Sequence, residues 1–173
     1  MKRCRLRLSS GFALGLVLGF AVVSLPAQTV SRNPAMPHPR IEKVEEPGRR
    51  IYLKTLAGAR LFVGPGVKPN KAVALIVHFH GAPWLIEHHI ARHLPRAALI
   101  TVQLGAGSSV YGRPFAEPEA FKAILDEAKR ALGLEREWSS ITLTGFSAGY
   151  GAVRAILRHN ENFSRVHNVL LLD

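Results

Sequence analysis

Apolar and polar positions divide most of the chain into short apolar runs and longer runs with helical spacing. The apolar runs are rich in β-branched residues, which is typical of strands covered on both faces of a parallel sheet. They cover residues 71–81, 97–105, 140–145 and 166–173. The helical runs between and around them cover 84–94, 117–134 and 148–160. Strict alternation of strand and helix predicts an α/β domain with right-handed crossovers.

Two further β-rich runs precede this alternation. "RRIYLKT" (49–55) and "ARLFVG" (59–64) flank Ala57 and Gly58, and this arrangement predicts a hairpin of two short strands. The expected fold class is therefore a three-layer α/β/α sandwich with a mostly parallel sheet.

The first 27 residues have the three regions of a secretory signal peptide. A basic stretch (1–10) is followed by an apolar run of fifteen residues (11–25) and a small-residue exit, with cleavage expected after Ala27. The expected location is secreted or periplasmic. An uncleaved membrane anchor is the alternative, although a spanning helix usually needs about 20 apolar residues.

The domain boundaries follow from this assignment. Residues 28–49 are rich in proline and charge, so they are expected to form a flexible leader. Residues 50–173 are expected to form the folded domain. The only cysteine, Cys4, lies in the signal region, so disulfide and cysteine redox chemistry are excluded for the exported form.

Composition and charge indicate an ordinary globular protein. The sequence is 47% hydrophobic and 20% charged, with a net charge of +11. Four of those charges lie in the signal region, and removing them from +11 leaves +7. The remaining basic residues form no block, so nucleic-acid binding is not expected. Attraction to a membrane or an anionic cell-envelope polymer stays open.

One serine lies in a context that suits a nucleophile. In "ITLTGFSAGYGAVRAIL" (141–157), Ser147 falls between a buried strand and a helix and is flanked by Gly145 and Gly149. A serine in a sharp strand-to-helix turn is strained, and its neighbours two positions away need to be small. The helix N-terminus can stabilise an oxyanion. The alternative is a serine that merely caps the helix.

A second motif follows the strand at 71–81. Together with the serine turn, the run His80-Gly81-Ala82-Pro83 resembles the α/β-hydrolase superfamily, and the esterase- and lipase-like serine hydrolases within it, over residues 50–173. The resemblance implies that the backbone N–H groups of Ala82 and Ala148 form the oxyanion hole. It also implies that His80 shapes the oxyanion loop and makes the Ala82–Pro83 peptide bond a candidate for the cis form.

A serine nucleophile needs a histidine base oriented by a carboxylate. After Ser147 the chain offers His159, which lies at the far end of a helix, and His167, which begins the last strand, so neither can reach the hydroxyl. Asp173 ends that strand and is the candidate acid. The resemblance implies a histidine beyond residue 173, so the chain is expected to be incomplete at its C-terminus.

Histidine pairs give a competing interpretation as a metal site. His78 and His80 share a strand face, while His89 and His93 lie four residues apart on a predicted helix. Neither pair has a carboxylate companion at the spacing of a metal site. No metal and no cofactor are therefore expected.

The predicted function is hydrolysis of an ester or related acyl bond in a small-molecule or acyl-bearing substrate, through a Ser147 acyl-enzyme. The loop at 105–121 is a candidate lining for the substrate approach. The chain of 173 residues is expected to be inactive by itself. The alternative is a non-catalytic binding module of the cell envelope with the same fold.

Overall fold

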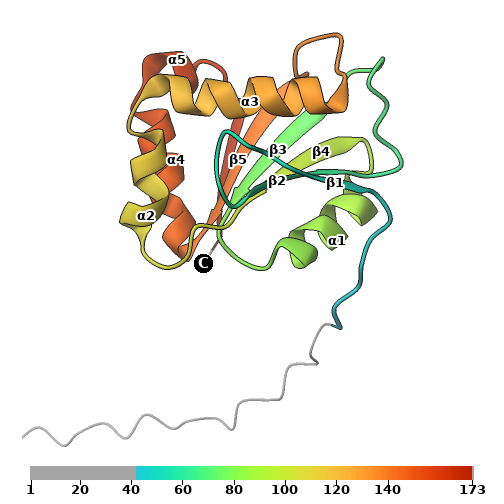
Figure 1. Cartoon of the computed structure of the whole chain (residues 1–173), viewed down its shortest axis with the longest axis horizontal. Helices are drawn as coiled ribbons and strands as arrows, with labels where there is room; N and C mark the ends of the chain where they lie inside the picture. The colour runs from blue at the N-terminus through green and yellow to red at the C-terminus, as the bar shows by residue number, and fades with distance from the viewer. Residues whose placement is uncertain (1–41, 173) are drawn as a thin grey trace, which may run out of the picture. The chain divides into compact units, whose positions relative to one another are not determined.

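A computed structural model describes residues 42–172 (Figure 1). The expected signal peptide, most of the expected leader and the candidate acid Asp173 lie outside the described residues. Of the helices in the described part, none is both long and apolar enough to cross a lipid bilayer.

Within residues 42–172, six strands form one mixed sheet in the order β1-β2-β4-β3-β5-β6. Their bounds are Arg49–Tyr52 (β1), Ala59–Val63 (β2), Ala74–Phe79 (β3), Ala97–Val102 (β4), Ser140–Phe146 (β5) and Asn168–Leu172 (β6). The hairpin pairing β1–β2 and the pairing β2–β4 are antiparallel, and the three others are parallel. The expected α/β class and the hairpin are confirmed.

Alternate residues of the central strands pack into two separate cores, one on each face of the sheet. In β3 and β4, Leu75, Val77, Ala98 and Ile100 belong to the larger core. The helices α2 (Ser108–Gly112), α3 (Pro118–Leu132) and α4 (Tyr150–Leu157) complete this core. The strand residues between those four pack with α1 (Pro83–His93) in a smaller core made of Phe62, Ile76, Ile90, Ala97 and Leu99. Figure 1 shows α1 below the sheet and α3 above it. Helices therefore cover both faces.

The helix α3 (Pro118–Leu132) shows why these sequences form these elements. It begins at Pro118, whose fixed φ suits the first turn. Its apolar stripe of Phe121, Ile124, Leu125, Ala128 and Leu132 is buried. Gly133 ends it with a φ of 70°, a left-handed conformation that favours glycine.

The segment 105–121 differs from the expected loop. It contains the short helix α2 (Ser108–Gly112) and a 3-10 turn, η1 (Arg113–Phe115). Tyr111 and Phe115 are fully buried, and the Phe115 ring packs edge-on against Phe79 and Phe121. The composition of this segment suggested a loop, but two buried aromatic side chains anchor it to the larger core.

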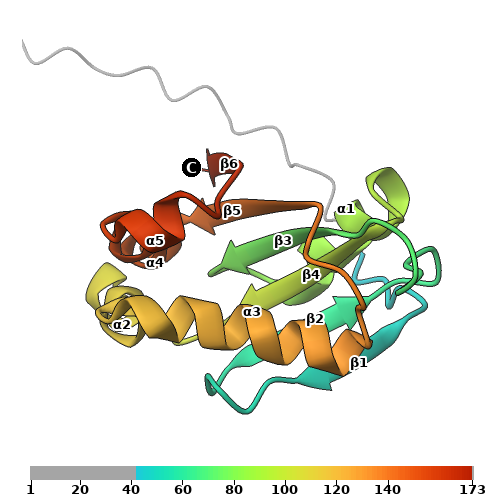
Figure 2. The same cartoon turned by 90° about the horizontal axis from the view of Figure 1, so that it is seen from above.

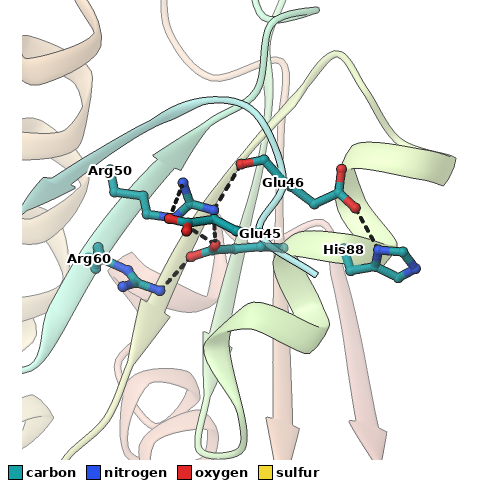
Figure 3. Close-up of polar contacts among 6 residues, drawn as sticks. Glu45, Glu46, Arg50, Arg60 and His88 are labelled. Carbon is teal, nitrogen blue, oxygen red and sulfur yellow. Dashed lines mark hydrogen bonds and ion pairs between the residues drawn. The ribbon is translucent and has the colours of Figure 1, made fainter. Parts of the chain in front are cut away.

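A buried carboxylate joins α1 to the first two strands. Glu87 in α1 is 1% exposed and accepts hydrogen bonds from Arg50 of β1, at 2.9 Å, and Arg60 of β2, at 2.6 Å. Nearby, His88 of α1 pairs with Glu46 at 2.5 Å (Figure 3). The Arg50 guanidinium also lies 5.1 Å from the centre of the Phe62 ring. These ion pairs hold the helix that follows the 80–82 loop.

The strand β6 forms one edge of the sheet, beside β5 (Figure 2). Val169, Leu170 and Leu171 are each between 44% and 53% exposed, so apolar side chains on both faces of this strand are in contact with solvent. Exposed apolar edge strands are sites at which sheets recruit further strands or aggregate.

Candidate active site

Ser147 occupies a strained turn at the carboxyl end of β5. Its φ is +46°, a left-handed conformation that residues other than glycine rarely adopt. The 3-10 turn η2 (Ser147–Gly149) leads directly into α4 (Tyr150–Leu157), and Ser147 is solvent-exposed. The serine therefore stands at the start of a helical segment, with its side chain open to a ligand.

Backbone atoms lie close to both flanking glycines, and most closely to Gly149. A Cβ atom at Gly149 would lie 2.1 Å from the carbonyl oxygen of Phe79, and one at Gly145 would lie 3.3 Å from the carbonyl carbon of Gly149. Gly151, which the sequence did not single out, is as restricted, because a Cβ there would lie 1.8 Å from the Ser108 carbonyl oxygen. The turn can pack this closely against β3 and α2 only because positions 149 and 151 are glycines.

The loop after β3 lies beside this turn. His80 has a φ of +69° and Gly81 a φ of +108°, so the chain bends sharply as it leaves the sheet. The His80 ring stacks on the ring of Phe146, the residue before Ser147, with centroids 6.0 Å apart and an interplanar angle of 6°. The two sequence motifs therefore meet at one edge of the sheet.

The expected oxyanion donors lie at helix starts. Ala82 is the N-cap of α1, and Ala148 lies in the first turn of η2. N–H groups at helix starts have no acceptor within the helix, so they are available to an anion. The expected cis form of the Ala82–Pro83 bond is wrong, because none of the described residues follows a cis peptide bond. Pro83 instead begins α1, where a trans proline with its fixed φ is favourable.

His80 is held by a residue that the sequence did not identify. Its Nδ1 lies 2.9 Å from the hydroxyl oxygen of Tyr111, and the N–H of Leu104 donates to the same oxygen at 3.1 Å. The rings of His80 and Tyr111 also meet edge-on. Tyr111 thus joins the loops after β3 and β4. A tyrosine in a glycine-rich stretch gave no signal of this role, because the role depends on contacts between distant segments.

His78 lies beneath the site and connects its two halves. Its Nδ1 is 2.6 Å from the Thr144 hydroxyl oxygen, three residues before Ser147. A Cβ atom at Gly81 would lie 3.5 Å from its Nε2. The side chain is 1% exposed, and burial lowers the pKa of the His78 imidazole below its usual range. His78 is therefore a buried neutral side chain that packs between β5 and the loop.

The lowered pKa of His78 predicts a loss of stability in mild acid. In the unfolded chain the histidine has a pKa of about 6.5. Below that pH the unfolded chain therefore binds a proton that the buried imidazole of the folded chain does not bind. The free energy of unfolding therefore does not depend on His78 above about pH 6.5. It decreases below that pH, by up to about 1.4 kcal/mol per pH unit. Urea unfolding between pH 7.5 and 5.5 measures this effect. We expect His78→Asn to be less stable at pH 7.5 but to lose less stability on acidification. Equal losses in the two proteins would contradict the prediction.

Two histidines of the described residues, His159 and His167, lie far from Ser147. His159 is the N-cap of the short helix α5 (Asn160–Phe163), beyond the far end of α4. His167 accepts a hydrogen bond from the N–H of Ile141, near the start of β5, which is about 20 Å of strand from Ser147. His89 and His93 stack on α1 with ring centroids 6.1 Å apart. Between residues 42 and 172, no group of three or more potential metal ligands comes together.

No family model matches the sequence, and no curated protein matches it. Among solved structures, the chain is similar to the siderophore hydrolase EstB from Aspergillus fumigatus, with 17% identity and a TM-score of 0.46, over 76% of this chain and 43% of that one. It is similar to esterase 2 of Thermogutta terrifontis phosphonylated by sarin, with 14% identity and a TM-score of 0.42, over 74% and 54%. An arylesterase structure has 23% identity and a TM-score of 0.42, over 76% and 46%.

The chain thus spans about half the length of the solved structures that it matches. At these identities and TM-scores, its function has to be inferred from its own site: an exposed, strained serine at a helix start, with the loop that leads into α1 beside it.

Proposed function

We propose that this chain is part of an exported serine hydrolase that cleaves an ester or related acyl bond. Ser147 is the nucleophile and forms an acyl-enzyme with the substrate. The N–H groups of Ala82 and Ala148 stabilise the oxyanion of the tetrahedral intermediate. The substrate is a small molecule or another acyl-bearing compound, and no cofactor takes part.

The single observation that carries the proposal is the backbone of Ser147. A φ of +46° at a residue other than glycine costs free energy, and such strain persists only where the surrounding structure imposes it. A serine that merely caps a helix has an extended backbone, which costs nothing. The strained turn instead keeps the hydroxyl exposed beside the 80–82 loop.

The proposal also includes a catalytic acid and a base, which concern a longer protein. Asp173 is the proposed acid, because it follows β6, which pairs in parallel with the nucleophile strand β5. Tyr150, in the first turn of α4, donates a hydrogen bond to the Leu172 carbonyl oxygen at 2.5 Å and so holds the end of β6 to the helix that follows Ser147. The base is a histidine after residue 173. The exposed apolar side chains of β6 support further structure packed there.

A fluorophosphonate probe tests the nucleophile. We expect it to label Ser147 in the protein made from the complete reading frame, because an activated serine attacks the phosphorus atom and displaces fluoride. Ser147→Ala should abolish labelling. Ser139→Ala is the matched control, because Ser139 is exposed and lies just before β5, at the end of the strand opposite to Ser147. The probe should label this variant as it labels the parent protein.

The same experiment distinguishes the alternatives. Absence of labelling, or labelling that survives Ser147→Ala, would leave the binding module of the cell envelope as the better assignment. For the chain of 173 residues we expect ester hydrolysis at least about 10⁴-fold slower than that of the complete protein, because the base is missing. Appreciable Ser147-dependent turnover by the short chain would contradict that part of the proposal.

A further inference from the structure

A basic groove lies between α2, η1 and α4, and none of the residues assigned a role in the proposed hydrolysis lines it. Its volume is about 440 Å³, which is within the range of about 300–1,000 Å³ for small-molecule sites. It is lined by Ser108, Ser109, Gly112, Arg113, Phe115, Ala116, Gly151, Arg154, Ala155, Arg158 and His159. Neither Ser147 nor the 80–82 loop is among these residues.

Small residues open the groove between the two helical walls. Gly112 and Gly151 meet where α2 crosses α4, and a Cβ atom at Gly112 would lie 3.3 Å from the Gly151 carbonyl oxygen. Ala116 and Ala155 continue the lining. Because these side chains are short, the longer arginine side chains stand around a hollow.

The charged side chains that line the groove are three arginines. Arg154 lies in α4, and Arg158 is the C-cap residue of that helix, one turn later and about 6 Å further along the axis. Arg113 comes from the opposite wall. All three are exposed, and none forms an ion pair with another residue of the described range 42–172. Among the described residues, no carboxylate lines the groove. The three arginines therefore have no ion-pair partner in this part of the chain.

We propose that this groove binds a soluble ligand that carries two or more phosphoryl groups. Guanidinium groups present planar pairs of N–H donors that match phosphate oxygens, and three of them need a ligand with several anionic oxygens in a small volume. The hydroxyl groups of Ser108 and Ser109 add donors to the same lining. A ligand with one anionic group would leave at least one guanidinium without a partner.

Tripolyphosphate is the probe, and isothermal titration calorimetry with the chain of 173 residues is the measurement. We expect binding that weakens as salt increases, and an affinity at least about tenfold higher than that for inorganic phosphate. Arg154→Gln and Arg158→Gln should each weaken tripolyphosphate binding by about tenfold, because each removes one charge-assisted contact. Glutamine keeps helix propensity, and both positions are exposed, so thermal unfolding should be nearly unchanged.

Arg136→Gln is the matched control, because Arg136 is an exposed arginine that does not line the groove. It should bind tripolyphosphate as the parent chain does. Three results would overturn the proposal: no binding of tripolyphosphate at millimolar concentration, equal weakening by Arg136→Gln and Arg154→Gln, or equally tight binding of citrate. Ser147→Ala should leave binding unchanged, so this test is independent of the proposed hydrolysis.

Discussion

Gly149→Ala is expected to destabilise the chain by about 3 kcal/mol and to abolish probe labelling of Ser147 in the complete protein. The added Cβ would lie 2.1 Å from the carbonyl oxygen of Phe79 and 2.7 Å from its carbonyl carbon. These are backbone atoms of a central strand, so no side-chain rotation relieves the clash. Either η2 or the end of β3 has to move, and both carry the site.

Gly64→Ala is the matched control for this substitution. A Cβ atom at Gly64 would meet only the Phe62 ring and the Pro95 carbonyl oxygen, at 3.8–4.0 Å, which is ordinary van der Waals contact. The free energy of unfolding of the Gly64→Ala variant should differ from that of the parent chain by less than about 1 kcal/mol. Urea unfolding measures both variants. The close packing of η2 on β3 would be disproved if Gly149→Ala were as stable as Gly64→Ala and still reacted with the probe.

Glu87→Ala is the second substitution with a large expected effect, a loss of about 3 kcal/mol in the free energy of unfolding. It removes the buried carboxylate that both Arg50 and Arg60 contact. Arg50 keeps its hydrogen bond to the Glu46 carbonyl oxygen, whereas the Arg60 guanidinium loses its ion-pair partner. The arginine side chains are 20% and 22% exposed, so water can reach them partly. That access places the expected loss at the lower end of the range for broken buried ion pairs.

Glu45→Ala provides the comparison. Its carboxylate also pairs with Arg50, at 3.7 Å, but its side chain is 83% exposed (Figure 3). Exposed pairs contribute at most about 1 kcal/mol, so the midpoint of urea unfolding should hardly move. If Glu45→Ala and Glu87→Ala unfolded at the same urea concentration, the buried cluster would not be what holds α1 to β1 and β2.

Local patterns along the chain determined the elements of the fold. Apolar β-branched runs predicted the strands, and the run 117–134 predicted α3 almost to its ends, because its apolar stripe and its proline and glycine boundaries are local signals. The turn at Ser147 was also recognisable from sequence, since Gly145 and Gly149 flank a serine between a strand and a helix. The roles of Ala82, Ala148 and Asp173 stay predictions.

Contacts between distant segments could not be deduced in this way. The segment 105–121 was expected to be a loop, yet Tyr111 is fully buried and bonds to His80. The trans Ala82–Pro83 bond was missed because the family resemblance suggested a cis form. A glycine, a tyrosine or a proline has the same local preferences wherever it occurs, and its role depends on what the fold places beside it.

The sequence by itself therefore determined which segments are strands and helices, and which serine occupies a sharp turn, because these properties depend on residues within a few positions. The position of the 80–82 loop beside that serine was expected only from the family resemblance. The tertiary structure decided that Tyr111 holds His80, that Glu87 contacts two arginines, and that three more arginines line one groove. Those arrangements arise from the sheet order, which brings residues far apart in the chain to the same edge or the same helix pair.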